Sequence, residues 1–389
     1  MKKRLYVDFH VLQTVPPSCI NRDDTGSPKT AMYGGVLRAR VSSQAWKHAM
    51  RKDFAENTLL DVGKRTKKAA ELVKKQILAL DSELDADKLA KKTLENTGIK
   101  SDDKGTKALF FMSTAQAKAL AALAVAGSTD KKEYQKALRA APSMDMALFG
   151  RMVADDPSLN YDAAAQVAHS ISTHAVKNEY DYFTAVDDCP AEDNAGAGHL
   201  GTVEYNSSTL YRYATVNVME LAEQLGAEQA AETVQAFGEA FLFSMPTGKQ
   251  NTFANRTLPD AVYVTIREDQ PVNLCGAFER AVSRGEQGGY AEASKAALAR
   301  YARAVVQKDP YAYLPVYNLV TLSLDDPAGY RGAAHRRATE QCHRLTAESA
   351  SPGFLPGELR PGQWQAVLSA HCVLCPVTCR VRVIGEETE

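Results

Sequence analysis

The sequence predicts an α+β fold. Segments whose polarity alternates with the period of a β-strand are separated by segments with the period of an amphipathic helix. A helix-rich block at 57–142 and a polar segment at 181–205 interrupt this order. When both are set aside, the remaining order is strand, helix, strand, helix, strand, which is compatible with a ferredoxin-like or RNA-recognition-motif sheet.

Local patterns define the N-terminal elements. Residues 5–13 alternate well enough for a strand. Ser42 or Ser43 is a suitable N-cap for a helix that would cover residues 44–54. In that helix Trp46 and Met50 are spaced i, i+4, and we expect both on its buried side.

Helices and strands alternate through the rest of the chain. Within 57–142, an Ala-rich helix is predicted at 115–126 and a basic helix at 131–139. Beyond this block, the predicted strands are 208–218 and 260–267, and the predicted helices are 227–245, 276–283 and 290–308.

Positive charge is concentrated at the N-terminal end. Residues 1–52 contain ten Lys and Arg against three Asp, a net charge of +7, whereas the chain of 389 residues has a formal charge of −1. A nearly neutral chain with one basic region indicates a localised polyanion site rather than a protein that coats nucleic acid everywhere.

Other bulk properties predict a cytoplasmic protein. The seven cysteines are an odd number, and most are isolated, which fits reduced thiols better than a disulfide framework. The N-terminus lacks the pattern of a signal peptide, and no apolar run reaches membrane-spanning length.

The basic region has the components of a phosphate site. Arg38 and Arg40 alternate with apolar residues, so an extended segment would point both guanidinium groups to one face. Lys47 and Arg51 are spaced i, i+4 on the predicted helix. A helix N-terminus with a Ser hydroxyl and a row of cations favours phosphate, because several donors converge on one group. From these residues alone, the alternative is a solvated basic helix face.

A series of motifs carries a resemblance to a known family. PSCINRDD (17–24) is followed by YGG (33–35) and RARVSSQAWKHAMRK (38–52). In the same order as in the family follow ALFGRM (147–152), AHSISTH (168–174), DYFTAVDD (181–188), HLGTVEY (199–205), YRYATVNV (211–218) and GKQNTFANR (248–256). Together these motifs, within residues 4–280, resemble the CasC family, the backbone subunit of the type I-E CRISPR Cascade complex.

The resemblance implies a domain organisation. A modified RNA-recognition palm would comprise 1–56, 143–178 and 207–307, with helical fingers inserted at 57–142 and a β-hairpin thumb at 179–206. The atypical tail at 308–389 does not resemble the family, and we expect it to contribute little to RNA binding.

The resemblance also implies a function. Copies of the chain would polymerise head-to-tail along CRISPR RNA, together with other Cascade subunits, in an antiviral ribonucleoprotein. They would present the guide for pairing with target double-stranded DNA. The family looks non-catalytic, and no cofactor is expected.

The expected RNA groove combines the residues carried over from the family with the two arginines of the basic segment. Their chemistry suits contact with phosphate and 2′-hydroxyl groups without reading bases. A guide carrier needs this, because its guide varies and base pairing supplies the specificity. The set is Arg22, Lys29, Arg38, Arg40, Ser42, Gln44, Lys47 and Arg51.

Two further groups carry over from the family. Met152, Phe183 and Thr184 are implied to hold a kink in the guide, because an apolar wedge can keep a nucleotide out of the stack. Lys131 and Lys132 are implied to attract target DNA by counterion release.

A competing hypothesis is a metal-dependent endoribonuclease. Asp23 and Asp24 are adjacent in a polar loop, and two carboxylates can hold a divalent cation beside a scissile phosphate. Related backbone subunits of type III CRISPR complexes use a loop Asp in this way. The simpler role of the pair is to bond loop amides, or to pair with Arg22 or a neighbouring copy.

A structural zinc site is a third hypothesis. The tail segment HCVLCPVTC contains one C-x-x-C half-site but lacks the second, separated half that zinc sites usually have. Its four possible ligands are His371, Cys372, Cys375 and Cys379.

Overall fold

The computed structural model describes residues 4–99, 101–102, 105–153, 156–185 and 199–308, and three strands at 318–324, 333–336 and 364–370. The chain divides into two compact units, Met1–Ala297 and Leu298–Glu389. In the second unit, β13 (Asn318–Leu324) pairs antiparallel with β14 (Ala333–Arg336) and β15 (Trp364–Ala370). Among the described residues, no helix combines the length and apolar character needed to span a membrane.

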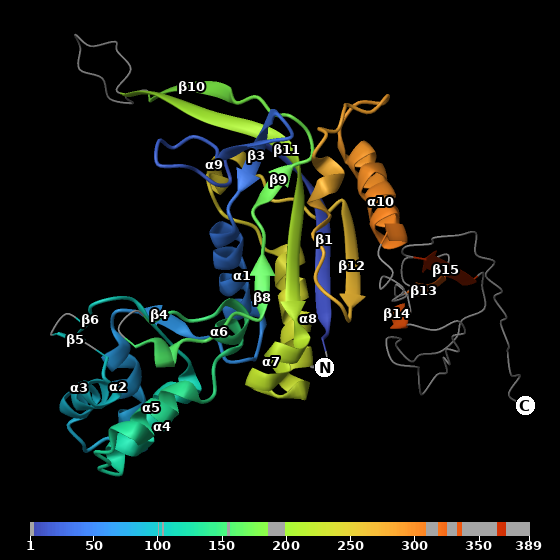
Figure 1. The fold of residues 1–389 in the computed structure, drawn as a ribbon. Helices are drawn as coiled ribbons and strands as arrows, with labels where there is room; N and C mark the ends of the chain where they lie inside the picture. Colours follow the sequence, from blue (N-terminus) through green and yellow to red (C-terminus); the bar gives the residue numbers. More distant parts are fainter. Residues whose placement is uncertain are drawn as a thin grey trace, which may run out of the picture. The chain divides into compact units, whose positions relative to one another are not determined.

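An antiparallel sheet organises the first unit (Figure 1). Its longest strands are β1 (Tyr6–Ser18) and β11 (His199–Asn217), and β1 pairs with residues 206–217 of β11. The sheet order is β12-β1-β11-β9-β3-β2, with β12 at Ala261–Arg267, β9 at Ser170–Ser172, β3 at Val36–Val41 and β2 at Thr30–Tyr33. The strands β8 (Ala165–Val167) and β10 (Glu179–Ala185) also pair with β11. The predicted α+β class is confirmed.

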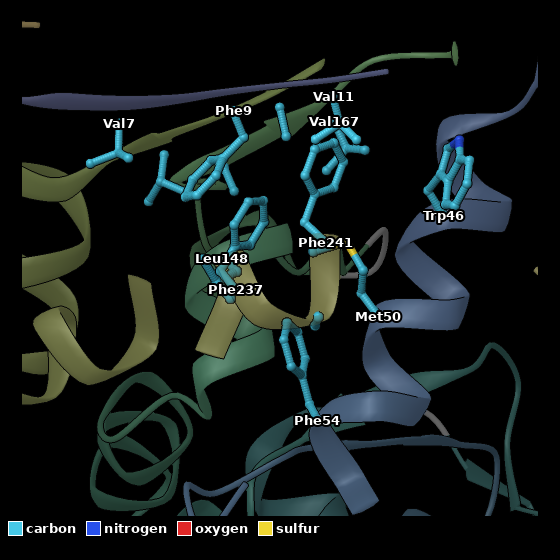
Figure 2. Packing of buried hydrophobic residues seen from close by; sticks show 14 of the residues in the cluster. Val7, Phe9, Val11, Trp46, Met50, Phe54, Leu148, Val167, Phe237 and Phe241 are labelled. Atoms are coloured by element: carbon cyan, nitrogen blue, oxygen red, sulfur yellow. The ribbon is translucent and has the colours of Figure 1, made fainter. Parts of the chain in front are cut away.

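Helices pack against one face of this sheet and form the main core (Figure 2). Alternate β1 side chains point into it, so the Phe9 ring lies 5.6 Å from the Phe237 ring, centroid to centroid. Trp46 and Met50 are fully buried, as their spacing predicts. Burying each such side chain stabilises the fold by about 1.5–3 kcal/mol. The helices are α1 (Ser43–Asn57), α6 (Met144–Phe149), α7 (Val218–Leu225) and α8 (Ala227–Phe243).

A second hydrophobic cluster is formed by the predicted helical block together with Leu159. Arg151 links three segments of this cluster. It is 4% exposed, and its guanidinium donates to the backbone oxygens of Leu159, Phe111 and Leu138. The helices are α2 (Ala69–Leu80), α3 (Ala86–Thr97), α4 (Thr114–Val125) and α5 (Lys131–Arg139). The short strands are β4 (Lys64–Thr66), β5 (Ser101–Asp102), β6 (Gly105–Thr106) and β7 (Phe110–Met112), and a 3-10 turn, η1, covers Pro157–Leu159.

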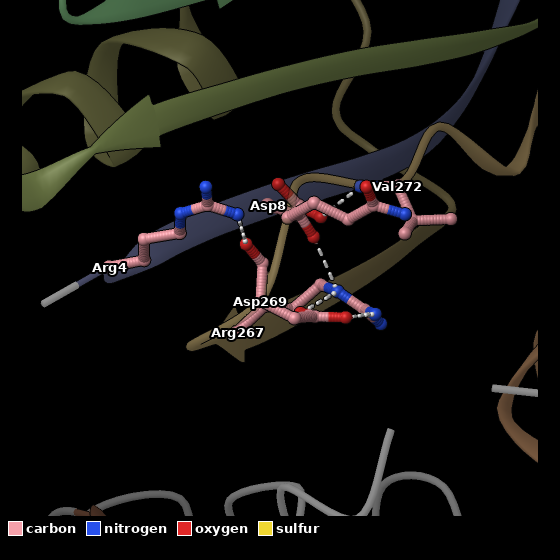
Figure 3. Close-up of polar contacts among 6 residues, drawn as sticks. Arg4, Asp8, Arg267, Asp269 and Val272 are labelled. Carbon is pink, nitrogen blue, oxygen red and sulfur yellow. Dashed lines mark hydrogen bonds and ion pairs between the residues drawn. The ribbon is translucent and has the colours of Figure 1, made fainter. Parts of the chain in front are cut away.

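The opposite face of β1 carries buried polar groups (Figure 3). Asp8 is fully buried and accepts from the backbone N–H of Val272 at 2.9 Å. Arg267 bonds the side chain of Asp269, and Arg4 donates to the Asp269 backbone oxygen at 3.3 Å. These bonds fasten the turn after β12 to the start of β1.

The predicted helix at 276–283 is wrong. The chain forms a 3-10 turn, η2 (Leu274–Phe278), and the helical pattern does not continue through residue 283. The guanidinium of Arg38 donates hydrogen bonds to the carbonyl oxygens of Phe278 and Glu279. The N–H of Val282 donates to the backbone oxygen of Thr173. These tertiary bonds replace the i to i−4 bonds that a helix would need. The predicted helix at 290–308 forms as α10 (Ala291–Lys308).

Candidate nucleic-acid interface

Asn21 joins the basic loop to the start of α1. Its side-chain oxygen accepts from the backbone N–H of Ser42 at 2.8 Å, and its backbone oxygen accepts from the N–H of Lys29 at 2.9 Å. Arg22 forms a β-bridge with Pro28 across the loop. The loop therefore holds the exposed Arg22 and the partly buried Lys29 beside the N-terminus of α1.

Of the two serines that the sequence offers as N-cap, Ser42 caps α1. Its hydroxyl accepts from the N–H of Ala45 at 3.3 Å, and its side chain is largely buried. Gln44 in the first turn is exposed. The hydroxyl is therefore engaged in capping, and the positive end of the helix dipole and Gln44 are left to attract an anion.

Arg40 lies on β3, the strand that leads directly into Ser42 and α1. Its Nε donates to the backbone oxygen of Thr30 at 3.1 Å, and Nη1 lies 3.2 Å from His169 Nδ1. Partial burial lowers the pKa of His169, and the charges of Arg40 and Lys29 lower it further. The imidazole is thus neutral near pH 7, and the positive charge here comes from Lys29 and Arg40.

Arg38 is not available to a phosphate in this structure. Its residue is 0% exposed, and its guanidinium donates to the backbone oxygens of Tyr33, Ser172, Phe278 and Glu279. The expectation that Arg38 and Arg40 present one shared cationic face therefore does not hold. Burial on the Arg38 side overrides the simple alternation of strand residues.

Lys47 and Arg51 meet a third cation that sequence analysis missed. Arg65 of β4 and Arg51 of α1 both stack on the ring of Phe111, at 5.1 and 4.7 Å from its centroid. Burial lowers the pKa of Lys47, and the charge of Arg65 lowers it further. The sequence places Arg65 in a run of basic residues that predicts only a solvated surface. Its pairing opposite Phe111 is what brings it to α1.

One carboxylate neutralises part of this cluster. Asp145 is fully buried and accepts from Arg51 Nε at 2.8 Å, from the Gly63 N–H at 2.9 Å and from the Ser143 hydroxyl at 2.7 Å. Within the described residues, it is the one carboxylate in ion-pair contact with the cluster. Arg51 is therefore held internally, and with one carboxylate against three cations the cluster keeps a net positive charge.

The strands β10 and β11 form a hairpin that carries the predicted thumb residues. Phe183 pairs with Gly201 across the hairpin and is 41% exposed, and Thr184 is also exposed. A Cβ atom at Gly201 would lie 2.3 Å from the Phe183 ring, so the missing side chain makes room for the ring. On the other face, Tyr180 and Tyr182 are also largely exposed.

Met152 lies elsewhere in the unit. It directly follows the buried Arg151 beyond α6, and it is 87% exposed. Single exposed apolar side chains are common on protein surfaces, so this exposure makes Met152 accessible but does not by itself mark a contact surface.

A family comparison identifies the family of the chain. The family model described as CT1975-like protein matches residues 7–345, well over half of the chain. The chain belongs to the CT1975-like protein family. A comparison with curated proteins gave no match.

Two solved structures resemble this CT1975-like chain. A chain of a "CRISPR RNA-guided surveillance complex, pre-nicking" is 35% identical with a TM-score of 0.67, over 79% of this chain and 90% of that chain. A chain of a "CRISPR RNA-guided surveillance complex" is 33% identical with a TM-score of 0.52, over 79% of this chain and 85% of that chain. The resemblance to the Cascade backbone subunit that the sequence motifs indicate is confirmed.

The acidic pair of this CT1975-like chain lies in a structured turn. The Asp23 side chain accepts from the hydroxyl of Thr25 and from the N–H groups of Thr25 and Ser27, and these bonds lower its pKa. Asp23 thus does what the simpler hypothesis expects, and it bonds loop amides. Asp24 is exposed. Among the described residues, no group of three or more His, Cys, Asp or Glu side chains is placed to hold a metal ion.

Two remaining predictions concern other parts of the chain. Lys131 and Lys132 are exposed in the first turn of α5, which Asp130 caps. The zinc candidates His371, Cys372, Cys375 and Cys379 lie outside the described residues.

Proposed function

We propose that the chain is a CRISPR RNA-binding backbone subunit of a Cascade surveillance complex, and that it acts as a scaffold without catalysis of its own. The observation that carries the proposal is the junction made by Asn21. It aligns Arg22 and Lys29 with the N-terminus of α1 in a chain whose relatives belong to CRISPR RNA-guided complexes. Such a row of cations and N–H groups binds a sugar–phosphate backbone of any sequence.

The proposed groove follows the described charges. It consists of Arg22, Lys29, Arg40, Gln44, Lys47 and Arg65, with Ser42 and Arg51 as supports that hold α1 and the cluster in place. Arg38 is left out because its guanidinium is enclosed by backbone oxygens. Lys131 and Lys132 on α5 are the proposed contact for target DNA.

The order of the elements supports the proposed palm, fingers and thumb. The elements β1, α1, β8, β11, α8 and β12 follow one another in the βαββαβ order of a ferredoxin-like palm, and β11 and β12 flank β1. The helices α2–α5 would be the fingers, and the β10–β11 hairpin the thumb.

The positions of Phe183 and Met152 support a filament of copies. Phe183 pairs with Gly201 near the start of β11. In α6, which precedes Met152, the backbone oxygen of Ala147 accepts from the N–H of Ala164, and Ala164 in turn accepts from Asn217 at the end of β11. At about 3.3 Å per residue, Gly201 and Asn217 are roughly 50 Å apart along β11. The two side chains would act on one nucleotide only if they came from neighbouring copies, which requires a repeating head-to-tail interface.

Co-purification tests the proposal. The chain is isolated from its own cells in mild salt, the bound RNA is sequenced, and the complex is incubated with Mg²⁺ or Mn²⁺. We expect discrete guide RNAs flanked by repeat sequence, and we expect them to stay intact. RNA that mirrors the bulk cellular pool would contradict guide binding. Metal-dependent cleavage of complementary RNA at regular intervals, lost on replacing Asp23 or Asp24, would contradict the scaffold role.

A further inference from the structure

A pocket of about 300 Å³ opens between α1 and the segment 244–256. Its walls include small or apolar side chains, namely Ala45, Ala49, Met245 and Pro246. Charged side chains of both signs, Lys52, Asp53, Glu56 and Arg256, surround it together with His48. Ser244 and Asn255 also line it, and both are nearly completely buried.

The two buried polar side chains lack partners. Among the described residues, Ser244 Oγ and Asn255 Nδ2 have no hydrogen-bond partner, although the two residues are 5% and 2% exposed. Native proteins satisfy most buried polar groups, because an unmade hydrogen bond costs stability. Ala254, directly before Asn255, adopts φ +46°, a left-handed conformation that residues with a Cβ atom rarely adopt. A strained backbone residue, Ala254, therefore lies directly before the unpaired side-chain amide of Asn255.

The pocket lies next to the proposed groove. It uses the face of α1 that carries Ala45, Ala49 and Lys52, whereas Gln44 and Lys47 lie on the neighbouring faces of the same helix. The segment 244–256 also touches the basic loop. A Cβ atom at Gly248 would lie 2.3 Å from the backbone oxygen of Ile20, two residues before Arg22.

The lining selects among ligands. A phosphate is disfavoured by the carboxylates of Asp53 and Glu56, and a single ion would leave most of the volume unfilled. A planar heterocycle fits the small apolar walls, and its edge offers acceptors to a buried amide. Every nucleobase carries a ring nitrogen or carbonyl oxygen that can accept from an N–H group, so this bond does not restrict the sequence.

We propose that this pocket takes one unpaired nucleobase of the bound single-stranded RNA, with Asn255 Nδ2 donating to the base and Ser244 Oγ bonding its edge. Lys52 and Arg256 would remain near the attached backbone. The inference rests on the proposed RNA-binding function and adds to it a contact with a base, one that tolerates any sequence.

The test compares two RNAs that share every phosphate. Binding of the full chain to a short oligouridine is measured against a fully abasic strand of the same length, for wild type and for the Ser244→Ala, Asn255→Ala double variant. We expect wild type to prefer the intact strand by about three- to tenfold and the double variant to lose this preference. The salt dependence should not change, because no phosphate contact is removed.

Stability separates a ligand-binding role from a structural one. If the two polar groups bond only a ligand, they stabilise nothing in the free protein. The free double variant then melts at or above the wild-type temperature. The matched control is Thr233→Val, because the buried hydroxyl of Thr233 on α8 also lacks a partner but does not line the pocket. This control should melt no lower than wild type and keep the preference for the intact strand.

The failures are distinguishable. Wild-type protein that binds neither strand contradicts RNA binding itself. In that case thermal shift with free uridine and adenosine tests the pocket alone, and both nucleosides should raise the melting temperature of wild type but not of the double variant. The pocket assignment is overturned if neither a base preference nor a nucleoside shift occurs, or if the double variant unfolds more easily. Self-association lost in the double variant, without any base preference, would assign the pocket to a neighbouring copy and also overturn it.

Discussion

Arg51 donates its Nε to Asp145 across 2.8 Å, and this bond joins α1 to the first turn of α6. The carboxylate is fully buried, while the Arg51 side chain is 21% exposed. The same guanidinium donates to the backbone oxygen of Gly63, which immediately precedes β4. A residue that the sequence predicts as a phosphate ligand therefore holds together α1, α6 and the segment before β4.

Breaking this pair should destabilise the protein. Asp145→Asn removes the charge that holds Arg51, and we expect a loss of about 2–3 kcal/mol in the free energy of unfolding. Urea denaturation measures it. Asp53→Asn, at a partly exposed carboxylate of α1, serves as the control and should cost well under 1 kcal/mol. An unchanged midpoint for Asp145→Asn would contradict a structural role for the pair.

Charge reversal at Lys47 and Arg65 should weaken RNA binding by similar factors for all sequences. Each lost phosphate contact should reduce the slope of log affinity against log salt by about 0.7. Filter binding across salt concentrations measures the slope. Lys75→Glu on an exposed position of α2 is the matched control, and it should leave the slope unchanged. A change in sequence preference, rather than in slope, would refute the phosphate groove.

Arg38 should behave in the opposite way. Arg38→Lys keeps the charge but cannot reach the four backbone oxygens that the guanidinium bonds, so we expect a loss of at least about 1–3 kcal/mol in stability. The salt slope of RNA binding should match that of wild type under conditions where the variant is folded. A normal melting temperature combined with a reduced slope would instead make Arg38 an RNA ligand.

The contact between Phe183 and Gly201 can be tested on both sides. Gly201→Ala places a Cβ atom where the ring lies, so the ring must move, although the exposed hairpin should lose little stability. We expect the variant to blur the regular pattern of unpaired guide positions, as Phe183→Ala should, with affinity mostly retained. Chemical footprinting of the assembled complex reports that pattern. Thr202→Ala, on the opposite face of the hairpin, should leave it intact.

Stability should fall as the pH falls below about 6.5 because of His10. Burial lowers the pKa of His10 to about 3, and Arg267 adds to this effect. Between these values the unfolded chain binds a proton that the folded chain does not, so each pH unit lowers stability by up to about 1.4 kcal/mol. His10 faces the hydroxyl of Tyr211 at 2.9 Å and the rings of Tyr213 and Tyr263.

Substitution isolates this contribution. The neighbouring Asp8 has a raised pKa because of its burial, and it contributes a pH dependence of the opposite sign. His10→Gln keeps a polar partner for Tyr211 and should reduce the loss of stability between pH 7 and pH 5. Chemical denaturation at each pH measures the difference. Equal slopes in wild type and variant would contradict a neutral, buried His10.

Sequence alone determined the class of the fold and the local elements that carry the candidate site. Hydrophobic periodicity and capping are local properties, and they located α1, its Ser42 cap and its buried Trp46 and Met50. The ordered motifs also led to the correct family, because residues that meet a shared ligand recur at fixed places in the chain.

Tertiary structure decided which cations are free. Arg38 and Arg40 look alike in sequence, but only Arg38 is enclosed by the carbonyl oxygens of a segment 240 residues further along the chain. Arg65 comes close to α1 only because it stacks on the same ring, Phe111, as Arg51 does. The pocket around Asn255 likewise forms only where α1 meets the segment 244–256. Local patterns cannot specify such contacts, because burial and charge balance depend on which remote groups the packing brings within a few ångströms.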